Sequence, residues 1–341
     1  MEKVLFLASV ESDGSLSRGS LETLSAAADV AASLPDSALV VGLIGDDVQA
    51  AADAVAACGA EKILGVSGAD FGVSRYATDA AAAAALIQAS EASVVVAPQC
   101  QRLARALPGV AQRLEGRIDT QVTGLSCDGG QLHIQRWYYR QRMVAHLRRE
   151  QRPWLLLIAS GVYGAWSGDA GSAAVEAVTP QLGDGERRTQ VKGMQAATAD
   201  AQTIRPDADI LFVAGAGWTK KQADGAAHTK EAEELILGIL EKASASLGSS
   251  KSLVEQSGEG QDVLPFMSHM NQVGQTGATP RHPKGLATCC HGEEPHVVGW
   301  RFINDRRAVN LDANCGWAHG KADVLYVADA FEVLAALNAI L

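Results

Sequence analysis

Short apolar runs alternate with amphipathic, alanine-rich stretches through the first 114 residues of the chain. The apolar runs have the length of strands buried on both faces, and they occupy residues 4–8, 38–42, 62–65 and 93–97. The stretches between them have helical periodicity and occupy residues 21–34, 48–58, 77–89 and 103–114. Because strands and helices alternate with short connections, this part of the chain predicts a parallel sheet covered by helices.

From Val122 onward the pattern changes to an alternation of apolar and polar residues. We expect hairpin-linked strands there that complete the first domain, at residues 131–137, 143–147 and 154–159. A stretch rich in Gly, Asp, Gln and Thr follows at 180–205, with a last short strand expected at 189–194. This composition predicts a linker at its end, so we place the domains at residues 1–204 and 205–341.

The last third returns to alternating strands and helices. Apolar runs predict strands at residues 209–214, 286–290, 308–312 and 324–328. Helical periodicity is found at 230–245 and again at 329–341, where Asp329 fits the N-cap. The chain is therefore expected to be an α/β protein, with a second α/β domain after the first.

Composition and charge restrict the kind of protein this is. The chain of 341 residues is 47% apolar, with a net charge of −10 and a pI near 5.3, which argues against nucleic acid or an anionic membrane as the main partner. Its first apolar run is short and is followed by Glu11 and Asp13, unlike a signal peptide, and no apolar run is long enough to span a membrane. Six cysteines without a C-x-x-C pair indicate reduced thiols, so we expect a cytoplasmic protein.

Several arginines interleave with Trp137, Tyr138 and Tyr139. They are Arg136, Arg140, Arg142, Arg148, Arg149 and Arg152. Such a pattern is compatible with a platform for single-stranded nucleic acid, or with a solvated strand face, for instance at a subunit interface. The acidity of the whole chain favours the second interpretation.

Two other patterns are weak signals for chemistry. The strand at 209–214 runs into Gly215-Ala-Gly217, but Lys220 stands where a dinucleotide fingerprint has its third glycine, and Ser9–Gly14 after the first strand lacks that fingerprint as well. The segment His291-Gly-Glu-Glu-Pro-His296 suggests a metal site, but its spacing is not H-E-x-x-H and Pro295 interrupts a helix there. We therefore expect no metal.

The segment Gln272-Val-Gly-Gln-Thr-Gly277 is too polar for a core strand and too rich in glycine for a helix interior. It fits a loop that presents backbone N–H groups, amides and a hydroxyl to a polar ligand, or an ordinary tight turn. Its sequence is the same as that of the flavin-binding loop of electron transfer flavoprotein (ETF) alpha subunits, which this chain resembles.

Further segments resemble the same family in the same order. Ser250-Lys251 stands where the family has Ser-Arg, Gly292 and His296 are retained from its Gly-Ile-Ser-Gly-Ala-Ile-Gln-His segment, and Val309-Asn310-x-Asp312 matches Ile-Asn-Lys-Asp. Ala322-Asp323 and Ala328-Asp329 match its paired Ala-Asp elements. The first two hundred residues resemble the family's N-terminal domain more diffusely, with Arg136-Trp-Tyr-Tyr where it has Arg-Pro-x-Tyr.

The resemblance implies a Rossmann-like, FAD-binding C-terminal domain. It implies that Thr276 bonds the isoalloxazine edge near N5, that Gln272 and Gln275 follow the ribityl and phosphate path, and that His296 lies near O2. Gly292 would face the pyrophosphate, and Asn310 and Asp329 would hold the adenosine end. The complete implied set is Ser250, Lys251, Gln272, Val273, Gly274, Gln275, Thr276, Gly277, His291, Gly292, His296, Asn310, Asp312 and Asp329.

The departures from the family pattern matter for the cofactor. Lys251 replaces an arginine over the flavin ring, which keeps the charge but loses the planar fork. The family's Gly-Arg-Gly is Gly215-Ala-Gly217 here, His291 and Glu293 replace residues near a phosphate position, and residues 256–271 form an insertion. We expect FAD to bind with an altered potential or pose.

The resemblance also implies partners. It implies an electron carrier that is not itself an enzyme, obligately paired with an ETF beta subunit that usually holds AMP. Electrons would arrive from a flavoprotein dehydrogenase, with an N-methyl amine or dimethylglycine-type demethylase as a candidate, and leave to a membrane ETF-quinone oxidoreductase. Two alternatives stay open. One is an ETF-like structural subunit without flavin, and the other is a free-standing flavin enzyme that would use histidines of the C-terminal region, namely His282, His291, His296 and His319.

Overall fold

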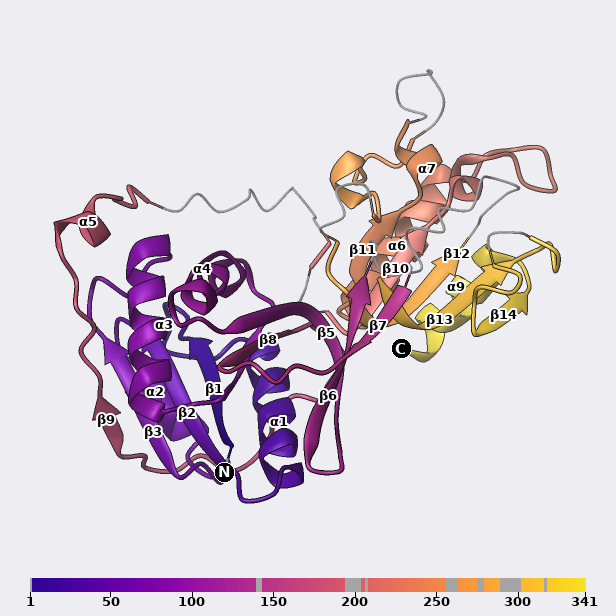
Figure 1. Ribbon diagram of the computed structural model, residues 1–341. Coiled ribbons are helices and arrows are strands. Elements are labelled where there is room, and N and C mark those ends of the chain that lie inside the picture. The colour runs from indigo at the N-terminus through magenta and orange to yellow at the C-terminus, as the bar shows by residue number, and fades with distance from the viewer. Residues whose placement is uncertain are drawn as a thin grey trace. The chain divides into compact units, whose positions relative to one another are not determined.

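The computed structural model describes residues 2–138, 143–193, 204–205, 208–255, 263–274, 279–288, 302–315 and 318–341 (Figure 1). The chain divides into two compact units, residues 1–194 and 195–341. The domain boundary that we place after residue 204 stays a prediction. None of the described helices is both long and apolar enough to cross a membrane.

The described part of the first unit contains a nine-stranded sheet with the order β7-β6-β5-β8-β4-β1-β2-β3-β9. Its strands are β1 (Lys3–Ser9), β2 (Ala38–Gly45), β3 (Lys62–Ser67), β4 (Val94–Pro98), β5 (Arg117–Asp128), β6 (Gln131–Tyr138), β7 (Met143–Leu147), β8 (Trp154–Ile158) and β9 (Val175–Ala177). Neighbours are parallel except for β5 with β6 and β6 with β7, which are antiparallel.

Helices cover both faces of this sheet. They are α1 (Arg18–Ser33), α2 (Gln49–Ala54), α3 (Tyr76–Ser90) and α4 (Gln101–Arg113), with the short α5 (Asp184–Arg187) near the end of the unit. On β1, Val4 and Phe6 face the core shared with α1 and α2, whereas Leu5 and Leu7 face the core shared with α3 and α4. Because side chains alternate along a strand, a continuous apolar run is what two covered faces require.

Two expectations for this unit are wrong. We expected the strand at 154–159 to be joined by a hairpin, but β8 lies between β4 and β5 and is parallel to both. The strand expected at 189–194 is absent over its described part, residues 189–193, and β9 closes the sheet instead. β9 has only three residues and is largely exposed, so no long apolar run predicts it. It pairs with β3 where Gly65 leaves room for Val175.

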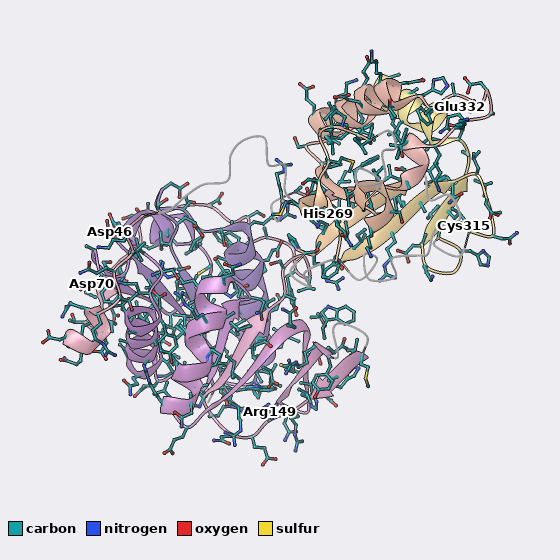
Figure 2. All side chains as sticks on the ribbon, turned by 90° about the horizontal axis from the view of Figure 1, so that it is seen from above. Asp46, Asp70, Arg149, His269, Cys315 and Glu332 are labelled. Atoms are coloured by element: carbon teal, nitrogen blue, oxygen red, sulfur yellow. The ribbon has the colours of Figure 1, made fainter. Side chains whose placement is uncertain are left out.

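Two of the arginines that interleave with the aromatic residues, Arg136 and Arg149, share a buried partner. Asp119 on β5 has a fully buried side chain, and it accepts hydrogen bonds from Arg136, from Arg149 (labelled in Figure 2) and from the indole N–H of Trp154, at 3.0, 2.9 and 2.9 Å. Burial acts to raise the pKa of Asp119, but these hydrogen bonds and the two positive charges outweigh it and lower that pKa. Two of the arginines are thereby fixed on the sheet.

The second unit contains, among its described residues, a five-stranded sheet in the order β11-β10-β12-β13-β14, and all its neighbouring strands are parallel. The strands are β10 (Ile210–Ala214), β11 (Ser246–Ser249), β12 (His282–Thr288), β13 (Ile303–Asn310) and β14 (Val324–Val327). The helical segments are η1 (Ala216–Thr219), α6 (Thr229–Lys242), α7 (Lys251–Glu255), η3 (His269–Asn271) and α9 (Ala330–Ile340). The α/β class predicted for the chain is confirmed.

One face of the second sheet packs against α6 and α9. Phe212 on β10, Ile236 on α6 and Leu334 on α9 share a core, and at its edge the ring of Trp218 lies 4.6 Å from that of Phe331. The opposite face packs Leu211 and Val273. β11 was not expected as a strand, because Leu247 is the one large apolar residue in its four.

Candidate functional site

The carboxyl ends of the second sheet bring together most of the described residues that the resemblance implies. β11 ends at Ser249, directly before Ser250 and Lys251, and β13 ends at Asn310, two residues before Asp312 in the following turn. β14 ends at Val327, two residues before Asp329. All strands of a parallel sheet end at the same edge, and this edge is where α/β proteins bind ligands.

The start of the predicted flavin loop is attached to β11. Gln272 forms a parallel bridge with Ser249, and the N–H of Val273 donates to the carbonyl of Ser249 at 3.1 Å. The Val273 side chain is buried, and a Cβ added at Gly248 would lie only 2.5 Å from Val273 Cγ2. The absence of a side chain at Gly248 therefore allows the loop to lie against the strand.

Thr279 holds the loop by a hydrogen bond from its C-terminal side, and Asn271 holds it from its N-terminal side. Gly274 has φ +82°, a conformation that favours glycine, and its N–H donates to Thr279 Oγ1 at 2.8 Å. Before the loop, Asn271 ends η3, which begins at His269 (labelled in Figure 2); its Nδ2 donates to the carbonyl of Leu247 at 3.4 Å. Gln275, Thr276 and Gly277 lie outside the described residues, as do His291, Gly292 and His296.

Ser249 has a buried hydroxyl without a partner among the described residues, which no sequence pattern predicts. Its side chain is 1% exposed, and within the described part of the chain its Oγ has no hydrogen-bond partner. An unsatisfied buried hydroxyl costs about 1–3 kcal/mol. Such an orphan hydroxyl beside Ser250 and Gln272 is suited to a polar ligand at this edge.

The neighbouring residues Ser250 and Lys251 differ in role. Ser250 is buried, its N–H donates to the carbonyl of Ala214 at 2.8 Å, and its Oγ accepts from the N–H of Leu253 at 3.3 Å. Ser250 thereby fixes the turn into α7. Lys251 begins this helix and is exposed, so its ammonium group stays at the surface of this edge.

The Gly215-Ala-Gly217 turn at the end of β10 is buried. The N–H of Gly215 donates to the carbonyl of Thr288 at 2.8 Å, and the indole N–H of Trp218 donates to Thr288 Oγ1 at 2.9 Å. Ala216 and Gly217 are both buried in η1. This turn is therefore part of the support beneath the edge.

A small cavity lies where β13 and β14 end. It has a volume of about 10 Å³, near the space of one water molecule, and is lined by Gln222, Val309, Asn310, Leu311, Ala328, Asp329, Ala330 and Phe331. Asn310 Oδ1 accepts from the N–H of Asp312 at 2.9 Å, and Asp312 Oδ1 accepts from the N–H of Asn314 at 2.8 Å. Asn310 and Asp329 thus line one cavity, and Asp312 shapes the turn beside it.

Asp329 has the N-cap role that the sequence predicts. Its Oδ1 accepts from the N–H groups of Phe331 and Glu332 at 2.7 and 3.4 Å, at the start of α9. The carboxylate is held in a fixed position at the cavity wall. Gln222 also lines the cavity, and no motif around it indicates this, because its position depends on how the loop after η1 folds.

The described residues contain no group of three or more His, Cys, Asp or Glu side chains placed to hold a metal ion. The segment His291–His296, considered above as a metal site, lies outside them. The described edge offers hydroxyl, amide and carboxylate groups together with an orphan hydroxyl and a partly apolar cavity. These groups fit a nucleotide-containing cofactor such as FAD, although the cavity would have to widen to admit an adenine ring.

Two α/β units, one built on a mostly parallel sheet and the other on a parallel sheet, define a protein of the α/β class. A model of the electron transfer flavoprotein domain matches residues 4–182, slightly more than half of the chain. The chain therefore belongs to the electron transfer flavoprotein domain family. No curated protein matches it.

Proposed function

We propose that this chain is the alpha-type subunit of a heterodimeric electron transfer flavoprotein, which binds FAD on its second unit and carries electrons one at a time. The observation that carries the proposal is the gathering of Ser250, Gln272–Gly274, Asn310 and Asp329 at one edge of the second sheet. Membership of the family, carried by the first unit, supports the same function.

Bound FAD would supply reversible one-electron chemistry, and the protein would supply position and electrostatics. Ser250 and Gln272–Gly274 would hold the flavin half at the end of β11, while Asn310 and Asp329 would hold the adenosine half at the ends of β13 and β14. Lys251 keeps a positive charge at this edge, which favours a negatively charged form of the ring. No general acid or base is required for this function.

The proposed partners follow from the resemblance. The chain would pair with a beta-type subunit that holds AMP, and accept electrons from a flavoprotein dehydrogenase. A demethylase acting on N-methyl amines or dimethylglycine is our candidate donor, and a membrane ETF-quinone oxidoreductase the acceptor. The acidic net charge of −10 suits docking onto basic patches of such partners. We place the protein in the cytoplasm.

A structural subunit that has lost its flavin is the second candidate, and two observations favour it. The described cavity has room for about one water molecule, and Ala216 stands in a buried turn where the family has an arginine. A free-standing enzyme is less well supported. His282, one of its candidate bases, is fully buried, with ring nitrogens 3.0 and 2.8 Å from the carbonyl oxygens of Pro280 and Arg205.

A visible absorption spectrum of the chain purified with its partner subunit, followed by titration with dithionite, tests the proposal. We expect flavin bands that pass through a one-electron reduced form. Thr276→Ala and Lys251→Ala should shift the midpoint of the titration, because both are proposed to lie at the ring. A colourless complex that cannot be reconstituted with FAD would leave the structural subunit as the function.

A further inference from the structure

We propose that Gln222 is a specificity residue that reads the exocyclic amino group of the adenine ring. The inference rests on the proposed function, because it assumes that the adenosine half of a dinucleotide enters the cavity at the ends of β13 and β14. It adds to that function a residue from the loop between η1 and α6, a segment to which the resemblance assigns no role. The proposal depends on the orientation of one side-chain amide.

The amide of Gln222 has only one orientation that fits its neighbours. Its Nε2 lies 3.1 Å from the carbonyl oxygen of Gly217 and 2.7 Å from that of Lys220. A carbonyl oxygen can only accept, so the atom facing both must be the nitrogen, and both amide hydrogens are used. The oxygen Oε1 is then the atom through which the side chain can bond a ligand, and it can only accept.

The loop that carries Gln222 holds this orientation. The backbone N–H of Gln222 donates to the carbonyl of Ala226 at 2.9 Å, and its carbonyl accepts from the N–H of Gly225 at 2.9 Å. Asp224 closes the loop, because its Oδ1 accepts from the N–H of Ala226 at 2.9 Å and its Oδ2 lies 2.8 Å from His228 Nε2. An amide fixed before the ligand arrives loses little entropy on binding.

The rest of the cavity wall suits a nucleoside and not a phosphate. Val309, Ala328, Ala330 and Phe331 supply apolar surface, and Phe331 is fixed by its contact with Trp218. The polar lining includes the carboxylate of Asp329, which repels an anion and accepts from hydroxyl groups. A flat apolar ring with an amino group and a sugar with hydroxyl groups, as in adenosine, complements this set of acceptors.

The chemistry of Gln222 predicts discrimination between two purines. Adenine carries an amino group at C6, which donates to Oε1, whereas hypoxanthine carries a carbonyl there, which can only accept. With the hypoxanthine ligand, the carbonyl oxygen at C6 would face Oε1 of Gln222. Both atoms can only accept, so they would repel each other and Oε1 would have no hydrogen bond. We expect such a ligand to bind about tenfold more weakly, the size of a lost neutral hydrogen bond with an unsatisfied partner.

Equilibrium titration of the flavin-free complex with FAD and with flavin–hypoxanthine dinucleotide, followed by flavin fluorescence, tests this inference. The unmodified chain should prefer FAD about tenfold, and Gln222→Ala should bind both ligands with nearly equal affinity. Gly164→Ala in the first unit is the control. An added Cβ there meets no atom within 4 Å, so this variant should keep both affinities and their ratio.

The possible failures are distinguishable. Equal affinity of the unmodified chain for the two dinucleotides would overturn the role of Gln222 and leave FAD binding intact. A preference that survives in Gln222→Ala would also overturn it, because another group would then read the ring. Failure of the unmodified complex to bind FAD at all would remove the proposed function and this inference together.

Discussion

The two units of the chain use their parallel sheets differently. In the first unit, β1 has six buried residues of seven and β4 is buried throughout, so both strands are apolar and covered on both faces. In the second unit, three of the four residues of β14 are exposed and β13 carries Asp305, Arg306 and Arg307 in its middle. The family match lies in the first unit, whose central strands are apolar. The candidate site lies in the turns of the second unit, whose strands carry polar and exposed residues.

This difference explains why the family match lies in the first unit and the candidate site in the second. A sheet covered on both faces constrains every residue of its strands, so its pattern is recognisable along the whole first unit. A site at the edge of a sheet depends on a few turn residues, such as Gly248, Gly274 and Asp329, while the strands beneath it can vary. The predictions below separate the two units by perturbing one at a time.

The largest expected effect concerns the first unit. Asp119→Ala would leave Arg136, Arg149 and the indole of Trp154 without their buried partner, and we expect it to lower the free energy of unfolding by about 3–5 kcal/mol. Urea denaturation followed by circular dichroism measures this change. Arg148→Ala, which removes an exposed pair with Glu150, is the control and should cost less than about 1 kcal/mol.

The same carboxylate predicts a dependence on pH. The pKa of Asp119 is lower in the folded chain than its ordinary value of 3.8, so its contribution to stability is fully present above that value. It should be lost as the pH falls through the folded pKa, and Asp119→Ala should flatten this part of the stability curve. Equal acid sensitivity of the variant and the unmodified chain would contradict the role given to Asp119.

The contrast between apolar and polar strands also explains which elements the sequence predicts. The strands at Val4–Ala8 and Ala38–Gly42 are predicted because both of their faces are apolar, and the helices beside them because their apolar residues recur with helical periodicity. Asp329 is predicted as a cap because an acidic residue directly precedes a helical run. β9 and β11 have too few apolar residues to be recognised.

Ser249 and Gln222 were not predicted as site residues, and the reason is physical. The orphan hydroxyl of Ser249 is defined by an absent partner, and the orientation of Gln222 by two carbonyl groups of a folded loop. Neither property is local in sequence. Only the three-dimensional arrangement of the edge brings these two residues to the ligand positions that the Gln272–Gly277 segment and Asn310 suggest.

The third prediction, with a smaller expected effect, perturbs the loop of the candidate site. Gly248→Ala would place a methyl group 2.5 Å from Val273 Cγ2 and displace the loop from β11. Overpacking of this kind costs about 1–3 kcal/mol, so we expect FAD affinity to fall about tenfold, measured by fluorescence titration. Gly164→Ala in the first unit, where an added Cβ meets no atom within 4 Å, should leave the affinity unchanged.

The smallest expected effect is that of Ser249→Ala, which should raise the stability of the protein and lower its affinity for FAD. Ser249→Ala removes an unsatisfied buried hydroxyl, so the flavin-free protein should become more stable by about 1 kcal/mol. If the hydroxyl bonds the cofactor, the affinity for FAD should fall several-fold in the same variant. Ser246→Ala is the control, because Ser246 Oγ accepts from the N–H of Arg205; it should lose stability and keep its affinity. A Ser249 variant with unchanged affinity would assign the hydroxyl no ligand.

The most direct test of the central claim is to label the cofactor site covalently. FAD carrying a photoreactive azide on its adenine ring would be bound to the complex, irradiated, and the labelled peptides identified by mass spectrometry. We predict labelled peptides from the second unit, around Gln222 and around Ala328–Phe331. Labelling that is displaced by unmodified FAD but falls within residues 2–193 would contradict the account, because the cofactor would then bind the first unit.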